Sequence, residues 1–214
     1  MPDPMPDPMS HAMPDRAAAL AAALGRVRAD VSPALAAPVR RARAWVDAGH
    51  LGLPRSVNVE CLNGTLGDAV DLARALTGCE PVEVYAEGTA TGLVASLLMT
   101  HGVVASLVVA DAPGLSSITA RLIGSHAHTE IDLAAPAVRR HGPDGMRLLP
   151  AEAAPGEPTA AAPTGGSPGY TLHDAAIAAD TTAAAHQSIA TGQPVAVPQE
   201  APHDGHRQRP GQPR

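Results

Sequence analysis

The spacing of apolar and polar positions in residues 63–84 predicts one amphipathic helix followed by a strand. The apolar side chains of the helix fall within an arc of about 120°, at about 100° per residue. They are Leu66, Ala69, Val70, Ala73 and Leu76. Gly78 follows shortly after the last of them, and glycine can end a helix in the left-handed conformation at little energetic cost. Residues 81–84 then indicate the entry into a strand. We therefore expect a helix with one buried stripe.

Two apolar segments, residues 93–100 and 103–110, predict a β-hairpin that turns at His101 and Gly102. A two-residue turn divides the side chains between two faces. The first face carries Leu93, Ala95, Leu97, Met99, Val104, Ser106, Val108 and Ala110, and the second carries Val94, Ser96, Leu98, Thr100, Val103, Ala105, Leu107 and Val109. Both faces are apolar, and the helices of a domain of this size can cover only one. We expect the face with Val103, Leu107 and Val109 to meet another subunit.

A second hairpin is predicted around Gly124 and Ser125. One face carries Ile118, Ala120, Leu122, Ala127, Thr129 and Ile131, and the other carries Thr119, Arg121, Ile123, His126, His128 and Glu130. The His126 and His128 pair is the most metal-like pattern in the chain. This register sets Arg121 directly opposite His128, and a fixed cation opposes a divalent metal. We therefore expect no metal site, but a solvated face with a diagonal Arg121–Glu130 pair.

Several short motifs, in the same order, resemble one known family. They are VDLARALTG followed by PVEVYAE (residues 70–87), VRRARAWVDAGHLGLP (39–54), LLMTHGVVASLVVAD (97–111), ITARLIGSHAHTEIDL (118–133) and a closing segment, residues 175–197. Together they are similar to the C-terminal domain of the glucose-fructose oxidoreductase and inositol dehydrogenase (Gfo/Idh/MocA) family. The resemblance implies an α+β fold, with an open, mainly antiparallel sheet and helices on one face. It also implies a sheet face that mediates oligomerisation.

Composition divides the chain into five segments. We expect a disordered leader with a short alanine-rich helix at 1–30, the sheet domain at 31–149, and a linker rich in Pro, Ala and Gly at 150–170. Residues 171–197 would add a closing helix and strand to the same domain, and 198–214 would form a disordered tail. The leader repeats Met-Pro-Asp and lacks the basic start and apolar centre of a signal peptide.

The chemistry that the family resemblance implies is incomplete in this sequence. Members of the family have a Rossmann domain with a glycine-rich turn, a lysine from a Glu-Lys-Pro motif, and an Asp-x-x-x-His pair on the helix described first. A dinucleotide site needs glycines at Gly-x-Gly-x-x-Gly spacing, and no glycines here have that spacing. All 15 cationic side chains are arginine, which does not easily shuttle protons. We therefore expect no cofactor on the chain alone, and NAD(P) only if a partner supplies a Rossmann domain.

The missing helix histidine leaves Asp68 as the one candidate catalytic residue. Without an alignment gap, Asp68 takes the place of the histidine and Gly64 that of the aspartate. With a gap of four residues, about one helical turn, Asp68 keeps the place of the catalytic aspartate and the histidine turn is deleted. We prefer the gap. In both alignments a carboxylate with a pKa near 4 is a poor base for a sugar hydroxyl. The alternative is that Asp68 is an acid in the first helical turn, favoured by the helix dipole.

Composition limits the partners and the compartment. The net charge of −6 argues against nucleic acid or an anionic membrane as a partner. The two cysteines, Cys61 and Cys79, are too few for a zinc motif or a disulfide scaffold, so a cytoplasmic location is expected. No apolar run approaches the length of about 18 residues that a membrane span needs. The core must be built from Leu, Val, Ile and Ala, because the chain has no Phe and one Trp.

Three functional hypotheses follow. The first is a non-catalytic scaffold, regulatory subunit or remnant that forms a homo-oligomer through its sheet face or joins a full-length family member. The second is half of a split oxidoreductase, which a Rossmann-domain partner completes in trans. The third is a fragment of a full-length dehydrogenase whose true start lies upstream of Met1. The missing histidine favours the first hypothesis over the second, and no motif identifies a substrate.

Overall fold

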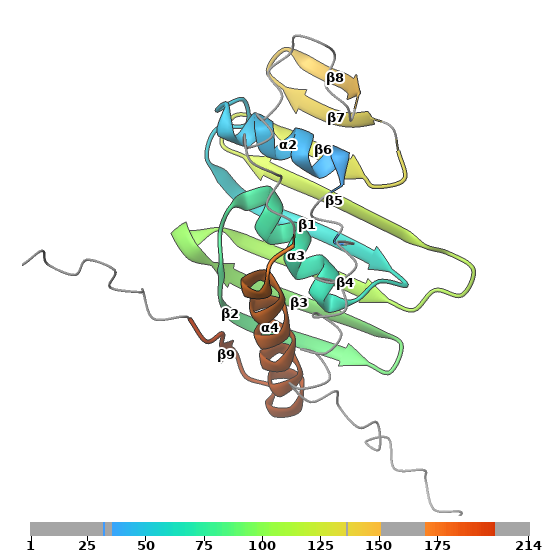
Figure 1. Ribbon diagram of the computed structural model, residues 1–214, viewed down its shortest axis with the longest axis vertical. Helices are drawn as coiled ribbons and strands as arrows, with labels where there is room; N and C mark the ends of the chain where they lie inside the picture. Colours follow the sequence, from blue (N-terminus) through green and yellow to red (C-terminus); the bar gives the residue numbers. More distant parts are fainter. Residues whose placement is uncertain (1–31, 33–35, 136, 151–169, 200–214) are drawn as a thin grey trace, which may run out of the picture.

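The computed structural model describes residues 32, 36–135, 137–150 and 170–199, and in them a single sheet forms one layer of the molecule (Figure 1). The helices are α2 (Ala37–Asp47), α3 (Leu66–Thr77) and α4 (Leu172–Thr191), with a short 3₁₀ turn, η2, at Thr100–Gly102. The strands are β1 (Pro54–Leu62), β2 (Pro81–Thr89), β3 (Gly92–Met99), β4 (Val104–Ala110), β5 (Ser117–Gly124), β6 (His128–Asp132), β7 (Ala137–Gly142), β8 (Gly145–Pro150) and β9 (Val195–Ala196). Their order in the sheet is β8-β7-β6-β5-β1-β4-β3-β2-β9.

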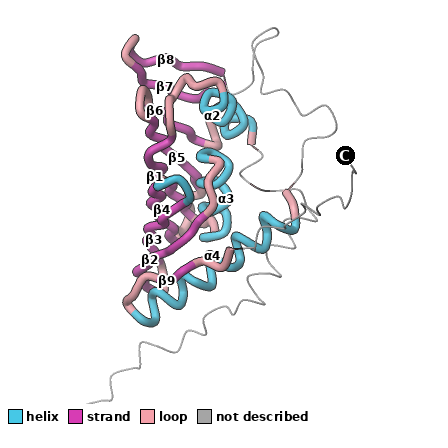
Figure 2. Tube along the Cα trace, turned by 90° about the vertical axis from the view of Figure 1, so that its left-hand side faces the viewer, coloured by secondary structure: helices cyan, strands magenta, loops and turns pink. Residues whose placement is uncertain are grey.

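All three α-helices lie on the same face of this sheet, as Figure 2 shows from the side. Helix α2 packs against β6 and β7, α3 against β1 and β4, and α4 against β2 and β9. Among the strands of the described residues, only β1 and β4 pair in parallel, and every other neighbouring pair is antiparallel. The expected α+β class, with an open and mainly antiparallel sheet and helices on one face, is therefore confirmed.

Helix α3 forms where the periodicity predicts it. All five apolar side chains of the predicted stripe are buried. Thr65 precedes the helix in an extended conformation, and Gly78 ends it with φ 68°, in the left-handed region. The amide of Gly78 donates to the carbonyl of Arg74 at 2.7 Å. These ends fix the helix across the centre of the sheet, where its stripe packs on β1 and β4.

A partly buried arginine, Arg74, joins α3 to α4 and to the start of β2. Arg74 donates through Nε to Glu80 at 2.5 Å and through Nη1 to Asp174 at 3.0 Å. Asp174 also belongs to the N-terminal capping box of α4, with Thr171 as the cap residue. At the other end of α4, β9 pairs with β2 at the edge of the sheet. Residues distant in sequence thus complete one layered structure.

The turn of the first hairpin has three residues, not the two that the sequence suggested. Thr100 leaves the β3–β4 ladder because its amide donates to the carbonyl of Glu80, and its hydroxyl accepts from the amide of Glu80. His101 and Gly102 then both take positive φ angles, 60° and 73°. The register therefore shifts by one residue, so that Leu97 pairs with Ala105 and Leu98 with Val104.

This shift reverses the faces of β4, so the predicted outward face is correct for Val94, Ser96 and Leu98 of β3 and wrong for β4. Leu107 and Val103 are buried on the helix side, and Val109 packs against the same core. The side chain of Val104 lies on the uncovered face instead, beside that of Leu98, and the two keep 47% and 45% of their surface exposed. A one-residue change of register moves every side chain of a strand to the other face.

The second hairpin has a longer turn than predicted, yet its faces are correct. The amides of Ser125 and His126 donate to the carbonyls of Leu53 and Leu51, so the turn is held against the loop before β1. A Cβ on Gly124 would lie only 2.0 Å from the carbonyl oxygen of Leu51, so this approach requires glycine. Pairing resumes at His128, two residues later than expected, and an even shift preserves the faces.

Part of the predicted organisation lies outside the described residues. This applies to the leader with its alanine-rich helix at 1–30, to residues 151–169 of the expected linker, and to residues 200–214 of the expected tail. Pro150 itself ends strand β8. Among the described helices, none is both long enough and apolar enough to cross a membrane.

Candidate functional site

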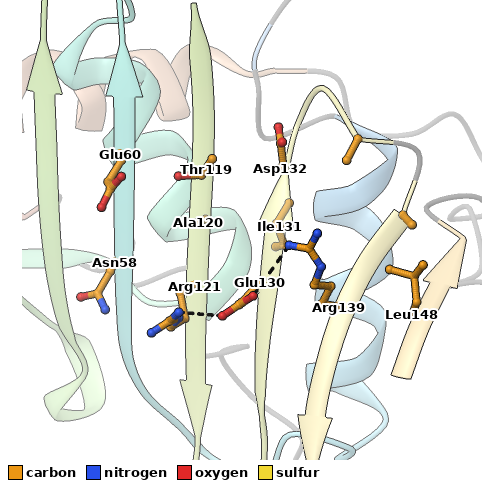
Figure 3. A pocket seen from close by; sticks show the side chains of 12 residues that line it. Asn58, Glu60, Thr119, Ala120, Arg121, Glu130, Ile131, Asp132, Arg139 and Leu148 are labelled. Atoms are coloured by element: carbon orange, nitrogen blue, oxygen red, sulfur yellow. Dashed lines mark hydrogen bonds and ion pairs between the residues drawn. The ribbon is translucent and has the colours of Figure 1, made fainter. Parts of the chain in front are cut away.

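The sheet face without helices has an apolar half and a polar half. The apolar half covers β3 and β4, where Val94, Leu98 and Val104 stand about half exposed beside Ser96 and Ser106. The polar half covers β1 and β5 to β8. There the strands form a groove of about 640 Å³ (Figure 3). Its lining includes Asn58, Glu60, Thr119, Arg121, Glu130, Asp132, Arg139 and Leu148.

The register of the strands places the polar side chains in rows across the sheet. Along one row, Asn58 of β1 pairs with Arg121 of β5, Arg121 with Glu130 of β6, and Glu130 with Arg139 of β7. In the next row, Ile123 pairs with His128, and His128 with His141. The antiparallel pairing therefore brings Glu130, His128 and His141 together on one face.

Glu130 lies between two arginines. Arg121 donates through Nη2 to Oε1 of Glu130 at 2.6 Å, and Nη1 of Arg139 lies 4.0 Å from Oε2 (Figure 3). Partial burial by itself would raise the pKa of Glu130, but the hydrogen bond and charge of Arg121 outweigh it and lower the pKa. The predicted Arg121–Glu130 pair is present. Its residues are directly opposite rather than diagonal, because pairing resumes two residues later than predicted.

His128 and His141 stack on each other. Their ring centroids are 4.4 Å apart with an angle of 5° between the planes, and Nε2 of His141 lies 3.7 Å from Oε2 of Glu130. Burial and the neighbouring charge of His141 lower the pKa of His128, to which Arg121 also contributes, while Glu130 acts in the opposite direction. At neutral pH this favours a neutral His128 imidazole.

The structure corrects the predicted position of Arg121, which is opposite Glu130 and not His128. His126 does not join the cluster, because its ring lies beside Gly52. His141 joins it instead. Sequence spacing could not find it, since the contact depends on the turn between β6 and β7. Among the described residues, His128, Glu130 and His141 are the group whose ligand atoms, all within 4.8 Å of one another, could hold a metal ion.

Asp68 is placed at the third position of α3, in a capping box with Thr65. The amide of Thr65 donates to Oδ2 of Asp68 at 3.0 Å, the Thr65 hydroxyl donates to the same oxygen at 2.7 Å, and the amide of Asp68 donates to that hydroxyl at 3.1 Å. These bonds satisfy donors at the helix N-terminus. The carboxylate therefore has a structural task in addition to any role at a site.

The nearby Cys61 offers no nucleophile. Burial, together with the charge of Asp68, raises the pKa of the Cys61 thiol to about 12. The thiolate is the reactive form of cysteine, so this side chain stays protonated near neutral pH. The region around the start of α3 thus combines a capping carboxylate with an inert thiol.

Comparison with known proteins identifies the fold. No protein-family model matches the chain, and no curated protein sequence matches it. Solved structures do match. An oxidoreductase domain protein from Kribbella flavida is 17% identical with a TM-score of 0.65, over 86% of this chain and 72% of that one. The aldose-aldose oxidoreductase from Caulobacter crescentus, in complex with glycerol, is 20% identical with a TM-score of 0.62, over 77% of this chain and 62% of that one.

A levoglucosan dehydrogenase in complex with NADH and L-sorbose is 16% identical with a TM-score of 0.64, over 88% of this chain and 79% of that one. The chain spans less than two thirds of several matched structures, including 62% of the Caulobacter protein. At these identities the likeness concerns the fold. This chain has the fold of structurally known oxidoreductases, over part of their length.

Proposed function

We propose that this chain acts as the substrate-side and oligomerisation half of a sugar or polyol oxidoreductase of the Gfo/Idh/MocA type, and that it is not catalytic by itself. The uncovered sheet face carries this proposal. Its apolar half exposes the paired side chains of Leu98 and Val104, and Val94 farther along β3, on the face opposite the helices. An exposed apolar patch of this kind is typical of an interaction surface.

The sequence supports the non-catalytic part of the proposal. It has no glycines at dinucleotide-binding spacing and no lysine, and no histidine between residues 51 and 100, where helix α3 lies. Asp68 is the one catalytic candidate that the family resemblance gives, and its carboxylate takes part in the capping box of the helix. A general base must reach the proton that it removes, and the histidine that does so in the family has no counterpart on α3.

Under this proposal, the partner is a second copy of this chain or a full-length member of the family. A Rossmann-domain subunit that completes the site in trans is the alternative, and Asp68 would then be its contribution from this chain. The two cases differ in activity. A scaffold stays inactive when mixed with such a subunit, whereas a split enzyme gains activity.

A titration with NADH and with NADPH, followed by fluorescence, tests whether the isolated chain binds a dinucleotide. We expect no saturable binding at micromolar concentration. A Kd in that range would correspond to a binding free energy of about −8 kcal/mol. A parallel assay with NAD⁺ and NADP⁺ should show no oxidation of glucose, levoglucosan or inositol. The levoglucosan dehydrogenase, whose structure contains NADH, provides the positive control for NADH fluorescence. Saturable binding or turnover by the isolated chain would overturn the proposal.

A further inference from the structure

From the cluster on the polar half of the uncovered face, we infer that His128, Glu130 and His141 form a binding site for a divalent transition metal such as Zn²⁺. This site is separate from helix α3 and from the apolar half of the same face. The inference rests on the positions, donor atoms and surroundings of these three side chains.

The backbone brings the three ligands together. His128 and His141 are direct partners in the antiparallel β6–β7 ladder, and Glu130 lies two residues beyond His128 on the same strand. Alternation along a strand then directs all three side chains to one face. Two adjacent strands, each held by pairing on both sides, fix the Cα positions of the site. The two imidazole rings are stacked in parallel, so they must rotate out of the stack before their nitrogens point at one ion.

The donor set suits zinc. Two imidazoles and one carboxylate are a common set of three protein ligands, with the fourth position left for water or another molecule. The ligand atoms lie within 4.8 Å of one another, and Nε2 of His141 is 3.7 Å from Oε2 of Glu130. Ligand atoms of a tetrahedral zinc are about 3.3 Å apart, from Zn–N and Zn–O lengths near 2 Å. The partly exposed side chains can close this gap by rotation about their χ angles.

The two arginines have different effects on the site. Arg121 donates to Oε1 of Glu130, which orients the carboxylate and leaves Oε2 directed toward His141. Metal-ligating carboxylates are commonly held in this way by an outer hydrogen-bond donor. Arg139, by contrast, lies 4.0 Å from Oε2 and opposes a cation there. Its side chain is 61% exposed, so it can move into solvent when a metal binds.

A metal binds only the neutral imidazole of His128. The charged and titratable groups that face it are His141, Glu130 and Arg121. Protons therefore compete with the metal for the histidines, and binding should weaken as the pH falls below the imidazole range.

A competition titration with a chromophoric chelator and ZnCl₂ tests the inference on the full chain. We expect the wild type to bind one Zn²⁺ per chain. The double variant His128→Gln/His141→Gln should bind at least about 100-fold more weakly, since loss of two ligands exceeds the effect of outer-shell changes. Circular dichroism checks that each variant is folded. If the double variant does not fold, the single variant Glu130→Gln should still weaken binding.

Two matched controls separate this site from other histidines. His126→Gln removes the other half of the His-x-His pattern and should leave Zn²⁺ affinity unchanged. His203→Gln/His206→Gln removes two histidines near the C-terminus and should also leave it unchanged. Loss of binding in either control, with binding retained in His128→Gln/His141→Gln, would overturn the inference. No Zn²⁺ binding by the wild type at micromolar concentration would overturn it as well.

A gain of affinity provides a second readout that mere loss of folding cannot produce. Arg139→Ala removes a cation that lies 4.0 Å from Oε2 of Glu130, and Zn²⁺ should bind several-fold more tightly. Co²⁺ in place of Zn²⁺ should give a visible absorption band typical of tetrahedral coordination. An unchanged or weaker affinity in folded Arg139→Ala, or an octahedral Co²⁺ spectrum, would contradict the proposed geometry.

Discussion

Truncation of Leu107 should destabilise the protein far more than truncation of Leu98, although both lie in the same hairpin. Leu107 is fully buried between the sheet and the helices, whereas Leu98 lies on the uncovered face with 45% of its surface exposed. Leu→Ala in a packed core loses transfer free energy and leaves a cavity, which together cost about 2–5 kcal/mol. At Leu98 roughly half of the side chain is already solvated, so we expect a cost of about 1 kcal/mol.

Urea unfolding measures both variants against the wild type. The single tryptophan, Trp45, is buried and reports the loss of the core by fluorescence, and far-UV circular dichroism provides an independent probe. The protein is kept dilute, so that self-association does not add to the free energy of unfolding of the wild type. If Leu98→Ala costs as much as Leu107→Ala, or more, the register of β3 and β4 described above is wrong.

Two further predictions concern ionisable groups. Burial alone would raise the pKa of Asp174, but hydrogen bonds from Thr171 and the charge of Arg74 lower it. The ionised Asp174 carboxylate therefore stabilises the folded protein above the ordinary pKa of 3.8, and this stabilisation is lost as the pH falls through the lowered native pKa. The stability gap between wild type and Asp174→Asn should therefore shrink in urea titrations below pH 3.8, and a gap independent of pH would contradict this. Burial raises the pKa of the Cys61 thiol to about 12. In the Cys79→Ala variant, Cys61 should therefore not react with a disulfide reagent while the protein is folded, and should react once it is unfolded. A fast reaction in the folded variant would contradict the burial of Cys61.

Local patterns predict the elements of this fold better than their pairing. The stripe of α3 and its end at Gly78 follow from helical periodicity and from the freedom of glycine, so the sequence is sufficient for both. The faces of the second hairpin follow from alternation, which an even shift of register does not disturb. In the first hairpin, contacts between Thr100 and Glu80 decide the turn, and they become visible only once β2 lies beside β3.

The same limit applies to the candidate metal site. His128 and Glu130 share a face by alternation alone, and the sequence shows this much. His141 joins them only because β7 pairs with β6 in one particular register. The parallel pairing of β1 with β4 is also non-local, since α3, β2 and β3 lie between them in sequence. Patterns within one element cannot specify contacts of this kind.

The free energy expected for assembly follows from the apolar side chains on the uncovered face. Leu98 and Val104 each leave about half of their surface exposed, and burying the rest contributes roughly 1 kcal/mol per side chain. A twofold-symmetric dimer uses each residue twice, which gives about 4 kcal/mol, or nearly a thousandfold in Kd. Aspartate at both positions would in addition bury unpaired charge. Leu115→Asp, on a loop with 60% exposure, is a control for the substitution itself.

Sedimentation equilibrium at micromolar concentration tests the central claim most directly, namely that the uncovered sheet face mediates assembly. We expect the wild type and Leu115→Asp to sediment as a dimer or larger oligomer, and Leu98→Asp/Val104→Asp as a folded monomer. A wild type that sediments as a clean monomer, or a double variant that remains oligomeric, would contradict the account.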